Sequence, residues 1–475
     1  MRSSVPLLLL VVHHILAVNP GVKIRFTPNG IKYANKIFKK EVSDLLGQLS
    51  LPDLECNIEG TSFTLSHIRA THVTPLNSKL KLDPGLNGLT VSVRNFGMSL
   101  SMDWQASSSI MFVPIHMSGG LRADFTGVRL KMTLGVALIN SVQVLGSSHC
   151  SADIEDLSLT FQGASSWIMN LIIVFFENSI KTNLPNEICR SVEDIINNDA
   201  AKKFRAMRVT AEIDQDFILD YGFIAPVRVT WGYLESQHKG DVYWKYSRVA
   251  TPYTPAVASD WRYNSKMLYM WITEYTAMTL GYSAHTFGYL RYTVTSDKLT
   301  DGLENYLNTT CPHLTCAGTI LPLLGAAVPH SQLVIDVRST AAPEIWFSTR
   351  GVHVSMSSSM IATVGRSSDP VFTGTLTLYI TGTASVRNQM IVGQVKKFRL
   401  KLNNSYSYIG HIFQSDLNDL LNEVSKVYLV PRLNDIAQKG IGLPLFEDVR
   451  LVDPRFFFQN GSIVVATNVQ YKNVQ

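Results

Sequence analysis

The sequence predicts an α+β protein built from long antiparallel strands and a few amphipathic helices. Alternating apolar residues run over unusually long segments, as in Val128–Leu138, and such strands exceed the usual length of about five or six residues. Only three segments have helical spacing together with helix-ending residues. Because a parallel sheet needs a regular alternation of strands and helices, we expect extended, strongly twisted antiparallel sheets.

The predicted strands carry apolar residues at every second position, which places those residues on one face. The parity of this pattern changes near Asn95, so we expect a β-bulge there. The alternating sets are Leu89, Val91 and Val93; Phe96, Met98, Leu100, Met102 and Trp104; Val128, Leu130, Met132, Leu134, Val136 and Leu138; Leu157, Leu159 and Phe161; Val352, Val354 and Met356; Leu376, Leu378 and Ile380; and Phe398, Leu400 and Leu402.

Three amphipathic helices interrupt this β pattern. The first follows an N-cap threonine and a first-turn proline, and spans 27–47. The second spans 165–196 and the third spans 411–438, and each contains a proline, Pro185 and Pro431 respectively. A proline inside a helical pattern interrupts the helix, so we expect a break at each.

The order of these elements suggests two similar halves. Long strands followed by a proline-interrupted helix occur once before residue 210 and once before residue 440. The segment between them is rich in Pro, Trp and Tyr, and we interpret it as a semi-rigid linker with strands at its ends. The predicted domains are 18–224, a linker over 225–263 that contributes to a shared sheet, and 264–475.

The first residues are typical of a secretory signal peptide. After one basic residue, the apolar run Val5–Val12 leads to the small residue Ala17, so we expect cleavage of 1–17 and an extracellular location. A membrane anchor is the alternative, but two histidines interrupt a run that already falls short of the roughly 20 residues needed. The ten residues Trp167–Phe176 cover about half of a bilayer, and we interpret them as a buried helix face.

An oxidising compartment changes the meaning of the five cysteines. Cys150 and Cys189 bracket a helical segment, and joining them would fix that helix to the preceding strand. Cys311 and Cys316 could close a small ring in a proline-containing loop. Cys56 is then left as a buried free thiol or an intermolecular partner. A zinc site is the competing interpretation, but no second C-x-x-C pair or histidine pair lies near, so we expect no metal.

Three triplets for N-glycosylation, at Asn308, Asn403 and Asn460, lie in the second half and fit a secreted chain, although such triplets also arise by chance. Lys and Arg total 42 against 37 Asp and Glu, a net charge of +5. This balance disfavours a nucleic-acid partner.

The sequence lacks the common catalytic motifs. It has no G-x-S-x-G elbow, no H-E-x-x-H, no P-loop and no convincing G-x-G-x-x-G after a strand. His67, His72 and His285 have no nearby Cys or Ser in a motif context, and we interpret them as structural. We expect no catalytic residues, although folding could still assemble a triad from distant positions.

Several fragments, in order and at characteristic spacing, resemble a known family. They are Asn19–Arg25, Gly30–Ala34, the pair Cys150 and Cys189, Asp220–Pro226, Leu429–Asn434 and Gly440–Leu445. Together the fragments resemble the bactericidal/permeability-increasing protein, lipopolysaccharide-binding protein and lipid-transfer family over almost the whole chain.

The resemblance implies an elongated boomerang of two pseudo-symmetric β-barrel domains, each with long amphipathic helices, joined by a central antiparallel sheet. It also implies that each barrel holds the acyl chains of a bound phospholipid in an apolar pocket. The expected partners are phospholipids or other amphipathic lipids, and transiently a membrane or lipoprotein surface.

Residues for these pockets follow from the helix faces that oppose an alternating sheet. The alternative for each of them is a position in ordinary packed core. The candidates are Ile31, Ala34, Phe38, Val42, Ile172 and Phe175 in the first half, and Leu417, Leu421 and Val424 in the second.

The function predicted from these features is secreted lipid binding, with transfer of lipids between membranes or particles. The alternative is innate-immune, antibacterial recognition of lipopolysaccharide, which in the family depends on lysine-rich loops at the tip of the first barrel. The corresponding segments here, Asp53–Glu59 and Met102–Ser109, contain four carboxylates and no Lys or Arg. The nearest basic residues, Lys79, Lys81 and Arg94, could form a modest patch, but we interpret them as ordinary solvated surface. Trp104 with Met102 could instead insert an apolar tip into a neutral lipid surface.

Overall fold

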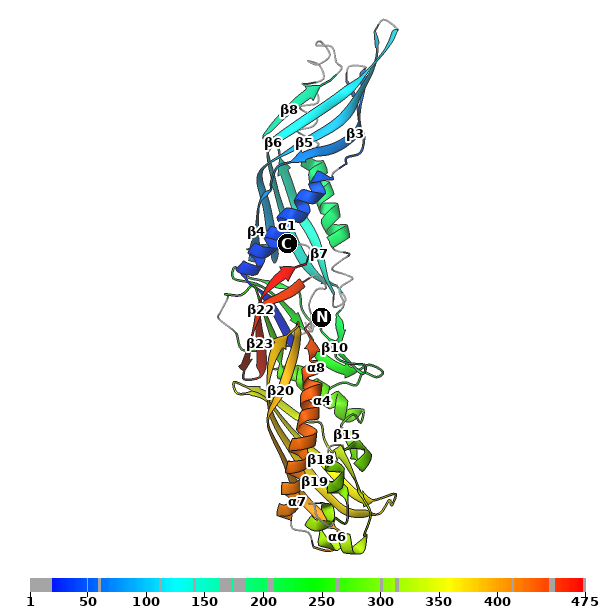
Figure 1. Cartoon of the computed structure of the whole chain (residues 1–475). Coiled ribbons are helices and arrows are strands. Elements are labelled where there is room, and N and C mark those ends of the chain that lie inside the picture. Colours follow the sequence, from blue (N-terminus) through cyan, green and yellow to red (C-terminus); the bar gives the residue numbers. More distant parts are fainter. Residues whose placement is uncertain are drawn as a thin grey trace, which may run out of the picture.

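The molecule is elongated, with a curled sheet at each end and a third sheet between them (Figure 1). This arrangement confirms the predicted α+β fold, although each end sheet is a half-barrel closed by helices. The computed structural model describes residues 19–48, 50–58, 61–110, 113–139, 142–162, 173, 185–200, 202, 209–260, 265–299, 302–311, 316–411, 414–443 and 449–472.

The central sheet is antiparallel and takes strands from all three predicted segments of the chain. The first strand lies inside it, and the last strand lies two places away, so the sheet joins the two ends of the sequence. In spatial order its strands are β11 (Arg228–Val229), β12 (Leu234–His238), β1 (Val22–Phe26), β14 (Leu268–Thr273), β23 (Ser462–Tyr471) and β22 (Val449–Gln459).

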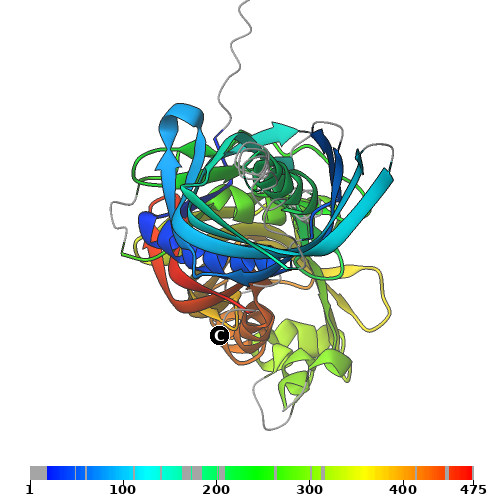
Figure 2. The same cartoon turned by 90° about the horizontal axis from the view of Figure 1, so that it is seen from above.

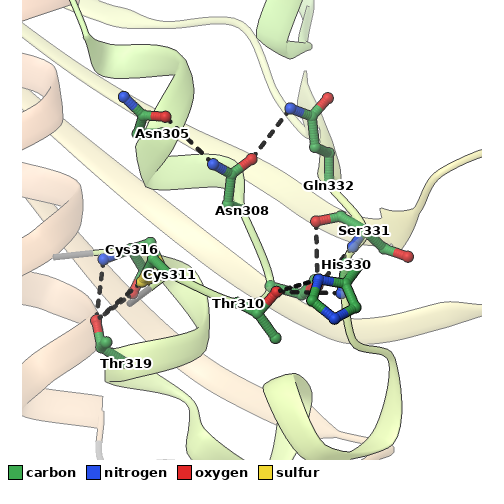
Figure 3. Close-up of a disulfide and its surroundings, with 10 residues drawn as sticks. Asn305, Asn308, Thr310, Cys311, Cys316, Thr319, His330, Ser331 and Gln332 are labelled. Carbon is green, nitrogen blue, oxygen red and sulfur yellow. Dashed lines mark hydrogen bonds between the residues drawn. A yellow bond between two sulfur atoms is a disulfide. The ribbon is translucent and has the colours of Figure 1, made fainter. Parts of the chain in front are cut away.

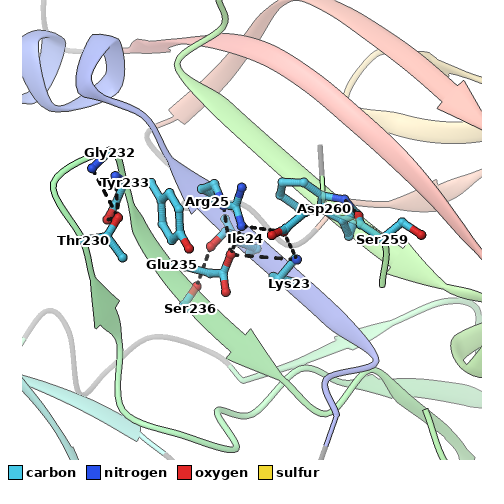
Figure 4. Close-up of polar contacts among 11 residues, drawn as sticks. Lys23, Ile24, Arg25, Thr230, Gly232, Tyr233, Glu235, Ser236, Ser259 and Asp260 are labelled. Carbon is cyan, nitrogen blue, oxygen red and sulfur yellow. Dashed lines mark hydrogen bonds and ion pairs between the residues drawn. The ribbon is translucent and has the colours of Figure 1, made fainter. Parts of the chain in front are cut away.

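Charged side chains hold the linker against this sheet (Figure 4). Arg25 on β1 is buried and donates to Glu235 on β12 at 2.6 Å and to Asp260 of the linker at 2.9 Å. Lys23 is also buried and donates to Asp260 at 3.3 Å. Both cations lie over the ring of Trp271. Because the buried positive charges have carboxylate partners, they avoid the desolvation cost of unpaired ions.

The first end sheet, together with the helices that cover it, is called the N-half. Seen from above, its long strands curve around the helices (Figure 2). The predicted bulge is confirmed, because the pairing of β5 with β6 shifts between Val93 and Met98, and Asn95 has a left-handed φ of 57°. The strands are β2 (Leu54–Ile58), β3 (Thr61–Val73), β4 (Asn77–Asp83), β5 (Gly88–Ile110), β6 (Val113–Ile139), β7 (Val142–Asp153) and β8 (Asp156–Phe161).

The second end sheet and its helices are called the C-half. Its strands are antiparallel and follow the spatial order β15, β16, β18, β19, β20 and the short β21, and β17 pairs with β18 off this path. They are β15 (Arg291–Val294), β16 (Leu333–Ser339), β17 (Glu344–Ser348), β18 (Gly351–Val364), β19 (Pro370–Arg387), β20 (Met390–Ser407) and β21 (Ile441–Gly442). A further small sheet comprises β9 (Thr210–Glu212), β10 (Phe217–Asp220) and β13 (Asp241–Trp244).

The predicted first and third helices are confirmed. Helix α1 spans Pro28–Gly47, and the hydroxyl of Thr27 accepts from the backbone N–H of Gly30 at 3.4 Å. The third helix is continuous through Pro431 rather than broken: α7 (Gln414–Val424) passes through the π-helical turn η5 (Ser425–Leu429) into α8 (Val430–Lys439). The wider turn precedes the proline at the start of α8, where a missing N–H costs least.

Of the second predicted helix, the structure describes residue 173 and the segment 185–194, followed by the π-helical η2 (Ile195–Ala200). In the described part of the chain, no helix is long and apolar enough to cross a bilayer. The remaining short helical turns are η1 (Pro84–Leu86), η3 (Ser296–Lys298), η4 (Leu303–Leu307), α5 (Ala317–Ile320) and α6 (Pro322–Ala327).

Helix α4 (Glu274–Thr286) was not predicted from the sequence. The residues that it buries are small rather than apolar: Thr279, Gly281, Ser283 and Ala284. A side chain at Gly281 would collide with Pro343, because its Cβ would lie 2.7 Å from the proline ring. Close approach to the neighbouring chain therefore selects small residues here and removes the hydrophobic periodicity that marks a helix.

Both candidate disulfides are present. Cys150 on β7 is bonded to Cys189 in the segment 185–194, so the bond fixes this helix to the edge strand of the N-half, as predicted. Cys311 is bonded to Cys316. The side chain of Cys56 lies outside the described residues.

Candidate functional site

The C-half contains a cavity of about 420 Å³ between the concave face of its sheet and the helix α7–η5–α8. Nearly all of its lining is apolar. The lining residues are Tyr289, Leu290, Arg291, Tyr292, Val294, Leu299, Tyr306, Leu307, Ala317, Leu321, Leu324, Leu333, Ile335, Val337, Met356, Ser358, Met360, Ala362, Val371, Phe372, Leu376, Leu378, Leu400, Ile409, Leu417, Leu421, Val424, Ser425, Tyr428, Leu429, Leu433 and Ile436.

The alternation of the strands builds the sheet side of the cavity. Every second residue of β18 from Met356 to Ala362 faces inward, and Leu376 and Leu378 do the same on β19. Side chains of one parity share a face of the sheet, so the concave face becomes continuously apolar.

The described residues 302–311 and 316–328, some of which Figure 3 shows around the disulfide, contribute Tyr306, Leu307, Ala317, Leu321 and Leu324 to the cavity lining. They include the Cys311–Cys316 disulfide, and Thr309 bonds to the backbone of Ser331 through both its N–H and its hydroxyl, at 2.9 and 3.0 Å. Gly318 is required here, because a Cβ would lie 1.8 Å from the carbonyl oxygen of Thr309. The leucines among these residues that line the cavity, such as Leu324, are buried.

The helix is fastened to one edge of the sheet by side-chain amides, which we call the amide ladder. Asn422 accepts from the N–H of Leu400 at 2.9 Å and donates to its carbonyl at 2.8 Å. Its other members are Gln414, Asn418, Asn434 and Gln438, which bond to the backbone of Leu402, Leu402, Val395 and Gly393 respectively. The ladder satisfies backbone groups of β20 that its short neighbour β21 does not reach.

Aromatic and cationic side chains fasten the same helix to the opposite edge. The hydroxyls of Tyr292 on β15 and Tyr428 on η5 lie 2.7 Å apart. Arg432 on α8 donates to Tyr292 at 2.8 Å, and both Tyr428 and Arg432 donate to the carbonyl of Lys298, at 2.8 and 3.1 Å. Burial and the hydrogen bond to Tyr292 raise the pKa of Tyr428 to about 12, so its hydroxyl stays neutral.

The opening of the cavity lies beside this second edge. The exposed lining residues lie there: Arg291, Tyr289 at 42%, Tyr292 at 39% and Ile436 at 64%. In contrast, Leu324 is fully buried. The exposed part of the apolar lining therefore lies between α8 and β15, whereas the lining around Leu324 is buried.

The predicted residues of the C-half lie in the wall of this cavity. Leu417, Leu421 and Val424 occupy successive turns of α7 and face the sheet. These residues line the cavity, and their contact with a bound lipid stays a prediction.

The predicted residues of the N-half are less uniform. Ile31 packs with Val227 and Val229 near the central sheet, whereas Phe38 and Val42 pack against the large N-half core. Ala34 is half-buried on the same helix. The remaining two candidates, Ile172 and Phe175, lie outside the described residues.

The interpretation of the first-barrel tip was wrong in two respects. Leu54–Ile58 forms β2 and Met102–Ser109 belongs to β5, so these segments are strands rather than loops, and Glu59 lies outside the described residues. Trp104 and Met102 cannot insert into a lipid surface, because they are 1% and 4% exposed and face the inside of the curled sheet. Phe161 packs edge-on against the ring of Trp104 at 6.3 Å.

The basic residues considered for that tip lie elsewhere. Lys79 and Lys81 on β4, and Arg94 on β5, are exposed on paired strands close to α1 (Figure 1). Figure 1 places this region towards the middle of the molecule, away from the far end of β5 and β6.

Sequence reasoning missed the sheet wall, the lining residues from Tyr306 to Leu324 and both fastenings of the helix. The alternation of Met356, Leu376, Leu378 and Leu400 could have identified the wall. The amides at Gln414, Asn418 and Asn422 recur every fourth residue, which places them on one helix face, and this signal also went unused.

Among the described residues, the three sequon asparagines differ in setting. Asn460 is exposed in the turn between β22 and β23. Asn403 donates to Thr377 at 2.8 Å, and Asn308 accepts from Gln332 at 3.0 Å. Glycosylation of all three stays a prediction. The described chain contains no group of three or more His, Cys, Asp or Glu placed to hold a metal.

The chain matches models of two domains of one protein family. The C-terminal domain model of the LBP / BPI / CETP family matches residues 211–471, and the N-terminal domain model matches residues 30–198. Bactericidal permeability-increasing protein of Sebastes schlegelii is 23% identical over 96% of this chain and 96% of its own. Lipopolysaccharide-binding protein of Homo sapiens is 24% identical over 98% of this chain and 97% of its own.

The fold agrees with this assignment. A crystal structure of lipopolysaccharide binding protein superimposes with a TM-score of 0.64 at 24% identity, and covers 96% of this chain and 100% of that one. The family matches cover both halves and every strand of the central sheet except β1. The chain therefore belongs to the LBP / BPI / CETP family and carries both of its domains.

Proposed function

We propose that the protein is a secreted lipid-binding protein that holds phospholipid acyl chains in the C-half cavity and transfers them between membranes or particles. The observation that carries this proposal is the apolar cavity of about 420 Å³, whose exposed lining residues lie between α8 and β15. Its volume lies within the range of about 300–1,000 Å³ that ligand pockets occupy. The two disulfides fit an oxidising, extracellular location.

The hydrophobic effect supplies the binding energy in this proposal. Each methylene transferred from water into the cavity contributes about 0.8 kcal/mol. An acyl chain would enter between α8 and β15 and extend towards Leu324. Such a chain dissociates slowly unless a membrane accepts it, which favours a carrier over an enzyme. The cavity wall offers only scattered polar groups, with no nucleophile and base in hydrogen-bonding contact among the lining residues.

Recognition of lipopolysaccharide is the second candidate, because several relatives carry that ligand in their names. The charge of the N-half disfavours it. Glu55 on β2 and Asp103 on β5 are exposed on strands that lead to the far end of this half, where a phosphorylated glycolipid would need cations, and Asp53, just before β2, is exposed as well.

Lipid extracted from natively purified protein distinguishes these functions. We expect mass spectrometry to find phospholipid in the wild-type protein, and a lipopolysaccharide signal instead would support the second candidate. Ala362 lies in the cavity wall and is 4% exposed. We expect Ala362→Phe to fill part of the cavity and to lower the molar ratio of lipid to protein at least twofold.

The matched control is Ala341→Phe, which makes the same change at an exposed position of the C-half. Circular dichroism establishes that both variants fold. Unchanged lipid content in a folded Ala362→Phe protein would place the lipid outside this cavity and contradict the proposal.

A further inference from the structure

Two cations at the open end of the cavity have no carboxylate partner among the described residues. Arg432 and Lys298 are both exposed beside Tyr292, which lines the opening. Their neighbour Arg291 differs, because it donates to the carboxylate of Asp336 at 2.5 Å. Of these three cations, one is neutralised by a carboxylate and two are available to an anion.

The hydrogen bonds around Arg432 fix its position without occupying all its donors. Two of its N–H groups bond to the hydroxyl of Tyr292 and the carbonyl of Lys298, at 2.8 and 3.1 Å. Its guanidinium carbon lies 3.9 Å from the ring centre of Tyr428, which is buried. Stacking and bonding together orient the guanidinium plane, and its remaining N–H groups are free to bind a ligand.

Lys298 approaches the same tyrosine from another element. Its ammonium group lies 5.6 Å from the ring centre of Tyr292 and donates to the carbonyl of Thr293 at 2.9 Å. An ammonium group has further protons to donate. Asp297 and Asp435 are neighbours of these cations in sequence, but neither forms an ion pair in the described part of the chain. Arg432 and Lys298 thus flank one exposed aromatic side chain at the cavity rim.

We propose that Arg432 and Lys298 bind the phosphate group of a lipid whose acyl chains occupy the C-half cavity, so that this opening selects phosphate-bearing lipids over uncharged ones. This inference rests on the proposed lipid-binding function. The planar guanidinium matches two phosphate oxygens at once, whereas the ammonium acts as a point charge. Tyr292 and Tyr428 are positioning residues, because they hold Arg432 at the rim.

Binding of two fluorescent lipids with identical acyl chains, phosphatidic acid and diacylglycerol, tests this inference on the full-length protein. We expect the wild-type protein to bind phosphatidic acid at least tenfold more tightly than diacylglycerol. Arg432→Gln should lower the affinity for phosphatidic acid about tenfold and leave that for diacylglycerol unchanged. Lys298→Gln should have a smaller effect of about threefold, and Arg432→Lys should retain part of the discrimination.

The matched control is Arg399→Gln, on the outer side of β20, which removes an exposed arginine far from the opening. Equal affinity of the wild-type protein for the two lipids, or equal effects of the two arginine variants, would overturn the inference and leave the proposed function intact. Failure to bind either lipid would overturn both. Displacement of phosphatidic acid by millimolar inorganic phosphate would show a site for free phosphate and would overturn the assignment to a lipid.

Discussion

The two halves close their curled sheets in different ways. In the N-half, the disulfide Cys150–Cys189 joins the helical segment to the edge strand β7. In the C-half, the amide ladder joins α7 and α8 to β20, beyond the reach of the short edge strand β21, through residues such as Asn418 and Asn422. One covalent bond fixes a single point, whereas the amides also satisfy backbone groups along a strand edge. The two halves therefore attach a helix to a strand of the curled sheet by different means, one covalent and one non-covalent.

Removing the covalent fastening should have the largest effect. Cys150 and Cys189 are 39 residues apart, and closing a loop of this length restricts the unfolded chain. We expect the double variant Cys150→Ser, Cys189→Ser to lose about 4 kcal/mol in the free energy of unfolding, measured in urea.

The control for this prediction is Cys311→Ser, Cys316→Ser, which opens a loop with a separation of only 5 residues. The same entropy argument gives about 2 kcal/mol for this bond. Equal losses in the two double variants would contradict the loop-entropy explanation.

Removing the non-covalent fastening should have a somewhat smaller effect. Asn418→Ala, Asn422→Ala leaves backbone groups of Leu400 and Leu402 without their partners. We expect a loss of about 3 kcal/mol in the free energy of unfolding. Hydrogen exchange at the amides of these two leucines should accelerate as well.

Asp419→Ala is the matched control on the same helix, because Asp419 is exposed and belongs to no described ion pair. It should change the free energy of unfolding by less than about 0.5 kcal/mol. A stable double variant with unchanged exchange would show that packing alone holds the helix on β20.

The central sheet should differ from both halves in its response to pH. His238 on β12 is 4% exposed, and burial lowers its pKa to about 4 despite its hydrogen bond to the carbonyl of Tyr221. The unfolded chain binds a proton near pH 6.5, whereas the folded protein does not until about pH 4. Stability is therefore lost as the pH falls through this window, by about 2 kcal/mol at pH 5 relative to pH 7.5.

Urea unfolding of His238→Gln at the two pH values checks this effect. Glutamine keeps a donor and an acceptor but does not titrate in this range. The variant should lose about 2 kcal/mol of the pH dependence. If its pH dependence matches that of the wild-type protein, another group is responsible.

Much of the architecture could be predicted from residue patterns because it depends on local periodicity. The bulge at Asn95 follows from a change of parity, and α1 follows from its cap and its spacing. The cavity-facing positions of Leu417 and Leu421 follow from the same argument. Helix α4 could not be predicted in this way, because close packing at Gly281 selects small residues rather than apolar ones.

The remaining features depend on contacts between distant segments. Burial of Trp104 arises from curling of the sheet, and an alternating pattern does not tell the concave face from the convex one. The phenolic contact between Tyr292 and Tyr428 joins residues that are 136 positions apart. The pairing of such residues needs the folded arrangement of β15 and η5, which no local signal contains.

The central sheet also limits how this molecule can be divided. Strand β1 pairs only with β12 and β14, and β14 pairs with β23 near the end of the chain. A fragment that ends between the family's two domain matches would keep β1 but lose every strand beside it. Neither portion is then a self-sufficient folding unit. A protein made to contain one half alone must also include the strands that pair with its part of the central sheet.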